Sequence, residues 1–186
     1  IGPDASRLRR LAAPRLPEPL WRALLDTFRR EGMVALRGAF VHLPEHGVRL
    51  SASEERIAQK VAPRLEQAGY EGAWARDLAR DANASEALMR PTLARLAQRG
   101  ELHQVVKDLY YPLATMARLA AIARNVAAAD GTQQVSAASF RDATGLGRKR
   151  AIQILEYFDR VGLLRRVGDM HKLRADSTLF VEAVMS

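Results

Sequence analysis

Three consecutive cations open a predicted helix near the C-terminal end of the sequence. Residues 145–150 read G-L-G-R-K-R, and an apolar repeat of helical spacing follows as far as Gly162. Cations are unfavourable at a helix N-terminus, because the helix dipole is already positive there. A bound phosphate would account for them, since free backbone N–H groups, the dipole and the cations would converge on it. These residues predict a phosphate-binding helix start, against the plainer alternative of a solvated charge run.

A second group of charged residues follows on a predicted β-hairpin. Its strands are residues 164–167 and 171–173, with a Gly-Asp turn between them. Residues 145–174 hold eight Lys and Arg against three Asp and Glu. We expect the helix start and the hairpin to be neighbours that contact one phosphate backbone. The predicted nucleic-acid-binding residues are Gly147, Arg148, Lys149, Arg150, Gln153, Arg165, Arg166, His171, Lys172 and Arg174.

Three side chains of this region are candidates for contacts with bases. Gln153 faces outward on the predicted helix, where it is placed to hydrogen-bond a base edge. Tyr157 lies on the flank of that helix and either stacks on a base or packs against protein. His171 either reads a base or fills the hairpin, and the sequence leaves both alternatives open.

The sequence contains no motif of an enzyme or a metal site. It has no G-x-x-x-x-G-K-[ST] phosphate loop, and its Ser, His and Asp residues form no hydrolase motif. The four histidines are scattered, and the lack of cysteine excludes disulfides and thiolate zinc sites. We therefore expect no catalytic residue, no metal and no cofactor. No apolar run approaches the roughly 18 residues that span a bilayer, so we expect no membrane partner.

The net charge of +8 and the pI of about 10.5 favour a polyanionic partner, although a basic protein without one is the alternative. The charge is uneven. Residues 1–50 hold nine cations and five acids, residues 51–112 nine of each, and residues 113–186 eleven cations and seven acids. The middle third is therefore expected to act as an electrostatically neutral spacer. Because the chain begins with Ile1 rather than Met, we expect it to be a piece of a longer protein.

One pattern recurs three times: an amphipathic helix, a glycine, and two short strands. The glycines are Gly32, Gly100 and Gly162, and a glycine just beyond a helix is the favoured left-handed cap. Two apolar residues three apart precede each glycine at the same offsets, which places them on one helix face. The predicted core positions are Leu25 and Phe28, Leu93 and Leu96, and Leu155 and Phe158.

Further helices precede the repeat helix, at residues 53–68 and 75–81 in the middle copy and 113–128 and 137–144 in the last. We expect Ser53 to cap the first of these with an incomplete capping box. The first copy is shorter, with helices at 6–13 and 18–30. Helix, strand, helix, helix and hairpin is the winged-helix plan. The predicted fold is mainly α with small β-hairpins (α+β), in tandem modules at 1–50 (truncated), 51–112 (spacer-like) and 113–186 (nucleic-acid-binding).

The region from Phe140 to Arg174 resembles the C-terminal end of the bacterial selenocysteine-specific elongation factors, the SelB family. The resemblance rests on F-R-D, then G-x-G-R-K, then L-E-Y-F-D-R-V-G, then R-R-x-G-D. Upstream, WRALLDTFRREG, GAFVHLP and ARLAQRGEL look like the preceding modules of that family. The similarity covers nearly the whole chain and is most specific over roughly its last fifty residues.

The resemblance implies a function. Members of the family are GTPases that bring selenocysteinyl-tRNA to the ribosome, and the last of their four C-terminal winged helices binds an mRNA hairpin beside an in-frame UGA codon. The chain would then be a truncated second module followed by the third and fourth, without the GTPase part. The ten residues named above would contact the hairpin. The other implied partners of the whole factor are selenocysteinyl-tRNA, GTP and the ribosome, in a monomeric, cytoplasmic protein.

Two other function classes compete with this one. A DNA-binding winged-helix transcription regulator would insert its recognition helix into a major groove, usually as a dimer. The crowding of cations at the helix start, and Glu156 on the outer helix face, fit that less well. A protein-interaction scaffold would bind through its hairpins, and its binding would survive high salt.

Overall fold

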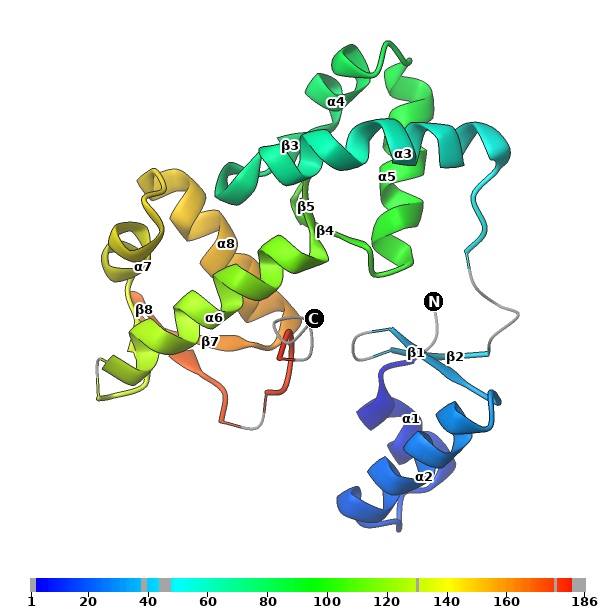
Figure 1. Cartoon of the computed structure of the whole chain (residues 1–186). Coiled ribbons are helices and arrows are strands. Elements are labelled where there is room, and N and C mark those ends of the chain that lie inside the picture. Colours follow the sequence, from blue (N-terminus) through cyan, green and yellow to red (C-terminus); the bar gives the residue numbers. More distant parts are fainter. Residues whose placement is uncertain (1–2, 38–39, 44–47, 130, 176, 182–186) are drawn as a thin grey trace.

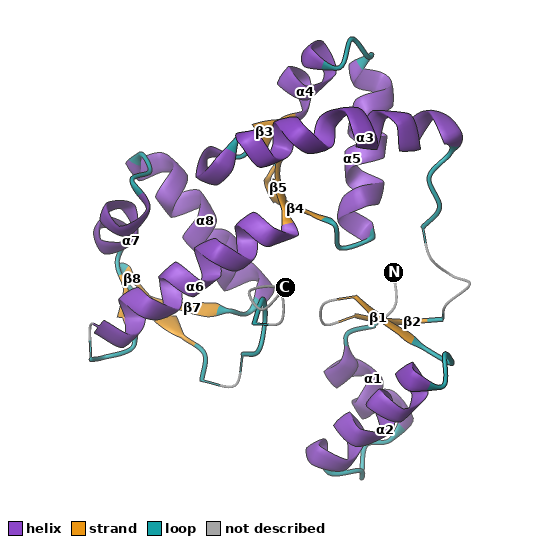
Figure 2. Cartoon of the chain, viewed as in Figure 1, coloured by secondary structure: helices purple, strands orange, loops and turns teal. Residues whose placement is uncertain are grey.

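The computed structural model describes residues 3–37, 40–43, 48–129, 131–175 and 177–181. Helices dominate these residues, and three small antiparallel sheets lie between them along the chain (Figure 2). Each sheet belongs to one of the three repeats (Figure 1). The predicted α+β fold with small β-hairpins is confirmed.

The first repeat holds two helices and one hairpin around a small core. Trp21, Leu25 and Val41 are buried in it, whereas the predicted core residue Phe28 is only partly buried. The Trp21 indole donates a hydrogen bond to the Ala5 carbonyl at 3.1 Å. Residues 38 and 39, between the two strands of this repeat, lie outside the described residues. The elements are α1 (Ala5–Ala12), α2 (Glu18–Arg30), β1 (Ala35–Arg37) and β2 (Phe40–His42).

The middle repeat has the complete winged-helix order. Its sheet has the order β3-β5-β4, with all neighbours antiparallel, and Leu93 and Leu96 are buried as expected. The elements are α3 (Ala52–Gln67), the 3₁₀ turn η2 (Gly69–Glu71), β3 (Ala73–Trp74), α4 (Ala75–Asp81), α5 (Glu86–Gln98), β4 (Leu102–Val106) and β5 (Leu109–Pro112).

The cap of α3 corrects the sequence prediction. Ser51, not Ser53, is the N-cap, and its capping box is complete. The Ser51 hydroxyl accepts from the Glu54 N–H at 3.3 Å, and the Glu54 carboxylate accepts from the Ser51 N–H at 2.8 Å. The carboxylate also pairs with Arg95 of α5. These bonds, above all the one from the Ser51 backbone, lower the pKa of Glu54 and hold it ionised although it is buried.

The last repeat follows the same order, with the sheet order β6-β8-β7. Gly162 ends its third helix at a φ of 91°, and Gly168 in the hairpin turn has a φ of 62°, so both glycines sit where side chains are disfavoured. Leu155 and Phe158 are fully buried. The elements are α6 (Leu113–Ala129), β6 (Gln134–Val135), α7 (Ala137–Thr144), α8 (Arg148–Val161), β7 (Leu164–Val167) and β8 (Met170–Leu173).

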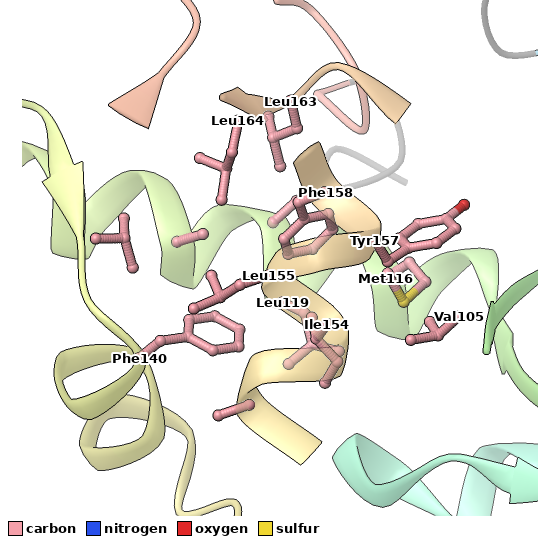
Figure 3. Close-up of a cluster of buried hydrophobic side chains, with 14 of the residues drawn as sticks. Val105, Met116, Leu119, Phe140, Ile154, Leu155, Tyr157, Phe158, Leu163 and Leu164 are labelled. Carbon is pink, nitrogen blue, oxygen red and sulfur yellow. The ribbon is translucent and has the colours of Figure 1, made fainter. Parts of the chain in front are cut away.

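One hydrophobic core crosses the boundary expected after residue 112. Val105, Leu109 and Tyr111 of the middle hairpin are fully buried in the same cluster as side chains of α6, α7 and α8. Figure 3 shows Val105 beside Met116 at the edge of this cluster. The Tyr111 hydroxyl also donates to the carbonyls of Tyr70 and Glu71, at 3.1 and 3.0 Å. Since β5 passes directly into α6, the middle and last repeats share both a core and a continuous backbone.

Candidate nucleic-acid interface

The start of α8 presents cations and unpaired backbone donors to the outside. Gly147 is the N-cap and supplies no side-chain acceptor to the first-turn N–H groups. A Cβ at Gly147 would meet nothing within 4 Å, so the fold itself leaves open space there. Arg148 and Lys149 are exposed, and neither forms an ion pair or side-chain hydrogen bond with the described residues. The arrangement matches an anion site at a helix N-terminus.

The hairpin of the last repeat carries a second exposed group of cations. Arg165 on β7 lies directly opposite Lys172 on β8, and both are exposed. Like charges opposite one another destabilise a sheet, so this pair favours a bound anion. Arg166 donates to the Gly168 carbonyl at 3.1 Å and lies 3.5 Å from the Glu156 carboxylate. Arg174, also exposed, donates to the Leu164 carbonyl at 3.2 Å.

One face of α8 connects these two groups. Lys149 and Glu156 are seven residues apart, so they lie on the same side of the helix, about 10 Å apart along its axis. Because Glu156 contacts Arg166, the hairpin lies along the side of the helix that begins with Lys149. Arg166 therefore lies on the Lys149 side of α8, whereas Arg165 and Lys172 alternate to the other face of the hairpin. Six of the predicted cations are exposed on these two elements: Arg148, Lys149, Arg165, Arg166, Lys172 and Arg174.

His171 lies inside the hairpin rather than on its surface. It is 5% exposed, and its Nδ1 is 2.7 Å from the Asp159 carboxylate of α8. On β8 the side chains alternate in direction, so Lys172 points out where His171 points in. Of the two alternatives left open by the sequence, the structure places His171 as a filler that joins β8 to α8.

Arg150 faces the middle repeat and also contacts Gln153 of its own helix. The Arg150 side chain is only 14% exposed and donates to the Gln153 side-chain oxygen at 3.1 Å. It pairs with Glu71 at 3.3 Å, and its guanidinium lies 5.4 Å from the centroid of the Trp74 ring. Gln153 is half-buried, and its side-chain oxygen is engaged by Arg150 of the same helix. Nothing in the local sequence signals the contacts with Glu71 and Trp74.

The same side of α8 continues into the module junction at its C-terminal end. Tyr157 is 6% exposed, and its hydroxyl is 2.7 Å from the His103 Nδ1. Burial raises the pKa of Tyr157 to about 12 and lowers the pKa of His103 to about 4. Arg160 is exposed, and it donates to the Val105 carbonyl at 2.7 Å. Tyr157 thus packs against protein and is not available to stack on a base.

Among the described residues, no group of three or more His, Asp or Glu side chains is close enough to hold a metal ion. No helix in the described part of the chain is both long and apolar enough to cross a bilayer.

Three family models match the chain in succession. Residues 1–43 and 127–173 match models described as "Elongation factor SelB, winged helix". Residues 50–111 match one described as "Selenocysteine-specific elongation factor, winged helix domain". All three describe winged-helix modules and none describes a catalytic domain.

Curated relatives carry the same name. The chain is 41% identical over 181 residues to the selenocysteine-specific elongation factor of Escherichia coli, covering 97% of this chain and 28% of that protein. It is 32% identical over 180 residues to the corresponding factor of Haemophilus influenzae, covering 97% of this chain and 29% of the relative. The chain therefore spans less than a third of the length of these two relatives.

Two solved structures resemble the fold of this chain. A structure of the mRNA-binding domain of elongation factor SelB from E. coli, in complex with SECIS RNA, matches with a TM-score of 0.62 and 43% identity. The match covers 67% of this chain and 99% of that domain. A bacterial selenocysteine-specific elongation factor matches with a TM-score of 0.54 over 93% of this chain and 26% of its own, and at 17% identity it supports the fold alone. With modules, relatives and fold in agreement, the chain belongs to the SelB family of selenocysteine-specific elongation factors and represents part of its winged-helix region.

Proposed function

We propose that this chain binds an mRNA hairpin of the SECIS type through the surface formed by the start of α8 and the last hairpin. The observation that carries the proposal is that these two elements expose six cations, in a chain 43% identical over 67% of its length to a domain solved with SECIS RNA. The proposed contacts come from Arg148, Lys149, Arg165, Arg166, Lys172 and Arg174, with the backbone N–H groups after Gly147. The binding requires no cofactor.

The proposed mechanism separates holding from reading. The cations contact phosphates on the hairpin stem, which supplies affinity and sensitivity to salt. The major groove of A-form RNA is too narrow to admit α8, so sequence is read on unpaired loop or bulged bases. The open space at Gly147 allows an RNA phosphate to approach the helix start without a side chain between them.

In the whole factor, we propose that this region tethers the GTPase part near a UGA codon. Selenocysteinyl-tRNA, GTP and the ribosome would be partners of the complete protein, acting as a monomer in the cytoplasm. The chain is 41% identical to the E. coli factor over 97% of its own length, which supports this assignment.

The geometry disfavours the DNA-regulator alternative. A recognition helix that enters a major groove needs a free outer face. On α8 that face is partly occupied, because Gln153, Tyr157 and Arg160 contact groups of the same helix or of the middle module. The helix start and the hairpin side are exposed and open to a nucleic acid.

The test is a titration of the whole chain with a bulged RNA hairpin and with a DNA duplex of matched length, at two salt concentrations. We expect RNA-selective binding that weakens steeply as salt rises. Preference for the DNA duplex would favour a transcription regulator instead. Binding to neither nucleic acid would contradict the proposal.

A further inference from the structure

We infer that Arg150 is a positioning residue rather than a residue that contacts RNA. It attaches α8 to the middle module and so fixes the orientation of the RNA-binding cations. The functional meaning of this role rests on the proposed RNA binding, but the attachment of α8 to the middle module can be tested without RNA. Arg150 is the third cation of the 148–150 triplet, and its two neighbours are exposed.

The surroundings of Arg150 already use its guanidinium. One nitrogen donates to Gln153, another pairs with Glu71 of η2, and the plane lies over Trp74 of β3. Glu71 and Trp74 belong to the middle module, 79 and 76 positions away in sequence. With 14% of its side chain exposed and a carboxylate beside it, Arg150 offers little charge to a phosphate.

The helix faces explain why neighbouring cations have different roles. Successive residues of a helix are turned by about 100°, so Arg150 is turned by about 200° from Arg148. Arg148 therefore points away from Arg150, which contacts the middle module. Lys149 lies between them, and its side chain is exposed without an ion pair among the described residues. A run of three cations that looks uniform in sequence is divided by helix geometry into two contact residues and one anchor.

A second arginine holds the other end of the same helix. Arg160 donates to the Val105 carbonyl, and its guanidinium lies 5.1 Å from the centroid of the Tyr157 ring. Ten residues separate Arg150 from Arg160, which is about 15 Å along the axis. Two attachment points at this separation fix the direction of α8 relative to the middle module. The Arg150 attachment lies nearer the RNA-binding end, so its loss should disturb that end most.

The orientation can be measured directly. The chain has no cysteine, so Gln59→Cys on α3 and Ala138→Cys on α7 introduce two exposed spin-label sites without interference. We expect a narrow distance distribution in the parent and a broader or shifted one in Arg150→Ala and, more weakly, in Glu71→Gln. Glu86→Gln removes a carboxylate that pairs with Arg90 inside α5, and serves as the matched control with an unchanged distribution.

The RNA affinity of the variants then shows whether Arg150 orients α8 or contacts a phosphate. Glu71 is itself an acid, so removing it strengthens binding if only charge matters. If it orients α8 through Arg150, Glu71→Gln weakens hairpin binding by roughly two- to fivefold, and the double variant is no weaker than Arg150→Ala alone. Arg150→Ala also leaves the slope of log K against log salt unchanged.

An unchanged distance distribution in both variants would overturn the inference. So would a Glu71→Gln variant that binds RNA as well as or better than the parent while Arg150→Ala lowers the salt slope by about one, as loss of a phosphate contact does. Glu71 is 62% exposed on its side chain, so Glu71→Gln is expected to fold even if Arg150→Ala does not. A parent that binds no RNA at all would refute the proposed function but leave the distance measurement decisive for the attachment of α8 to the middle module.

Discussion

At the scale of single residues, the site divides by exposure rather than by residue type. Arg148, Lys149 and Lys172 are exposed, whereas Arg150 and His171 are held in contacts with protein. Exposed side chains can exchange water for phosphate at little cost to the fold. Held side chains exchange less easily, since release of His171 would leave the largely buried Asp159 without its partner, and release of Arg150 would break its contacts with Glu71 and Trp74.

Replacing an exposed cation should therefore separate affinity from stability. We expect Arg148→Ala or Lys149→Ala to weaken hairpin binding by about 1 kcal/mol and to reduce the salt slope by about one, with the melting temperature nearly unchanged. Arg118→Ala, which removes an exposed arginine from α6, is the control and should leave binding nearly unchanged. Fluorescence titration with thermal denaturation measures both quantities. A drop in melting temperature that accounts for the lost affinity would contradict the assignment.

At the scale of elements, the turn between α3 and β3 is tightly constrained. Gly72 has a φ of 70°, and a Cβ there would lie 2.4 Å from a ring carbon of Tyr111. That ring is fully buried and bonded through its hydroxyl to the backbone of η2, so it cannot move aside freely. The turn thus locks η2, which carries Glu71, against the middle hairpin.

Two glycines of this turn allow a matched comparison. We expect Gly72→Ala to destabilise the chain by about 3 kcal/mol, because it combines an unfavourable φ with a steric clash. Gly69→Ala has a similar φ of 52° but open space around its Cβ, and should cost about 1 kcal/mol. Denaturant unfolding of both variants measures the difference. Equal losses would mean that the contact with Tyr111 is relieved by movement of the ring.

Elements with local signals could be predicted from sequence. The bounds of α4 and α7 agree to the residue with the predicted 75–81 and 137–144, because apolar spacing and flanking residues define them. The cap at Ser51 was missed because a second serine, Ser53, lies two positions later, and the bonds between Ser51 and Glu54 select Ser51. The anchor at Arg150 could not be predicted, since its partners lie more than seventy positions away and no pattern within a helix encodes them.

At the scale of the whole molecule, the middle and last modules behave as one folded unit. The core of the last module includes Val105, Leu109 and Tyr111 of the middle hairpin. The ring centroids of Phe180 and His103 are also 5.3 Å apart. The middle module is therefore more than a neutral spacer. It completes the core beneath α8.

Truncation of the chain at the predicted boundary after residue 112 should expose the core that the two modules share. We expect residues 113–186 alone to be less stable than residues 50–186 by more than about 3 kcal/mol, because three buried side chains of the middle hairpin are lost. Denaturant unfolding and amide exchange of the two fragments measure this. Equal stability would show that the last module needs nothing from its neighbour.

The junction should also respond to pH through His103. Its pKa of about 4 lies below the ordinary 6.5, so the unfolded chain takes up the proton first as pH falls. Stability from this group is complete above pH 6.5 and is lost as pH falls towards 4, by about 2 kcal/mol at pH 5. The difference between unfolding curves of the parent and His103→Gln at pH 7 and pH 5 isolates this contribution. Parallel pH profiles would contradict it.

The direct passage of β5 into α6 has a mechanical consequence. Pro112 ends the strand and Leu113 begins the helix, so the backbone holds no slack between the two modules. Tension on an RNA gripped by the last module would pass straight into the middle module instead of first straightening a linker. A force on the bound mRNA would therefore displace the middle and last modules together, because the connection between them is rigid rather than flexible.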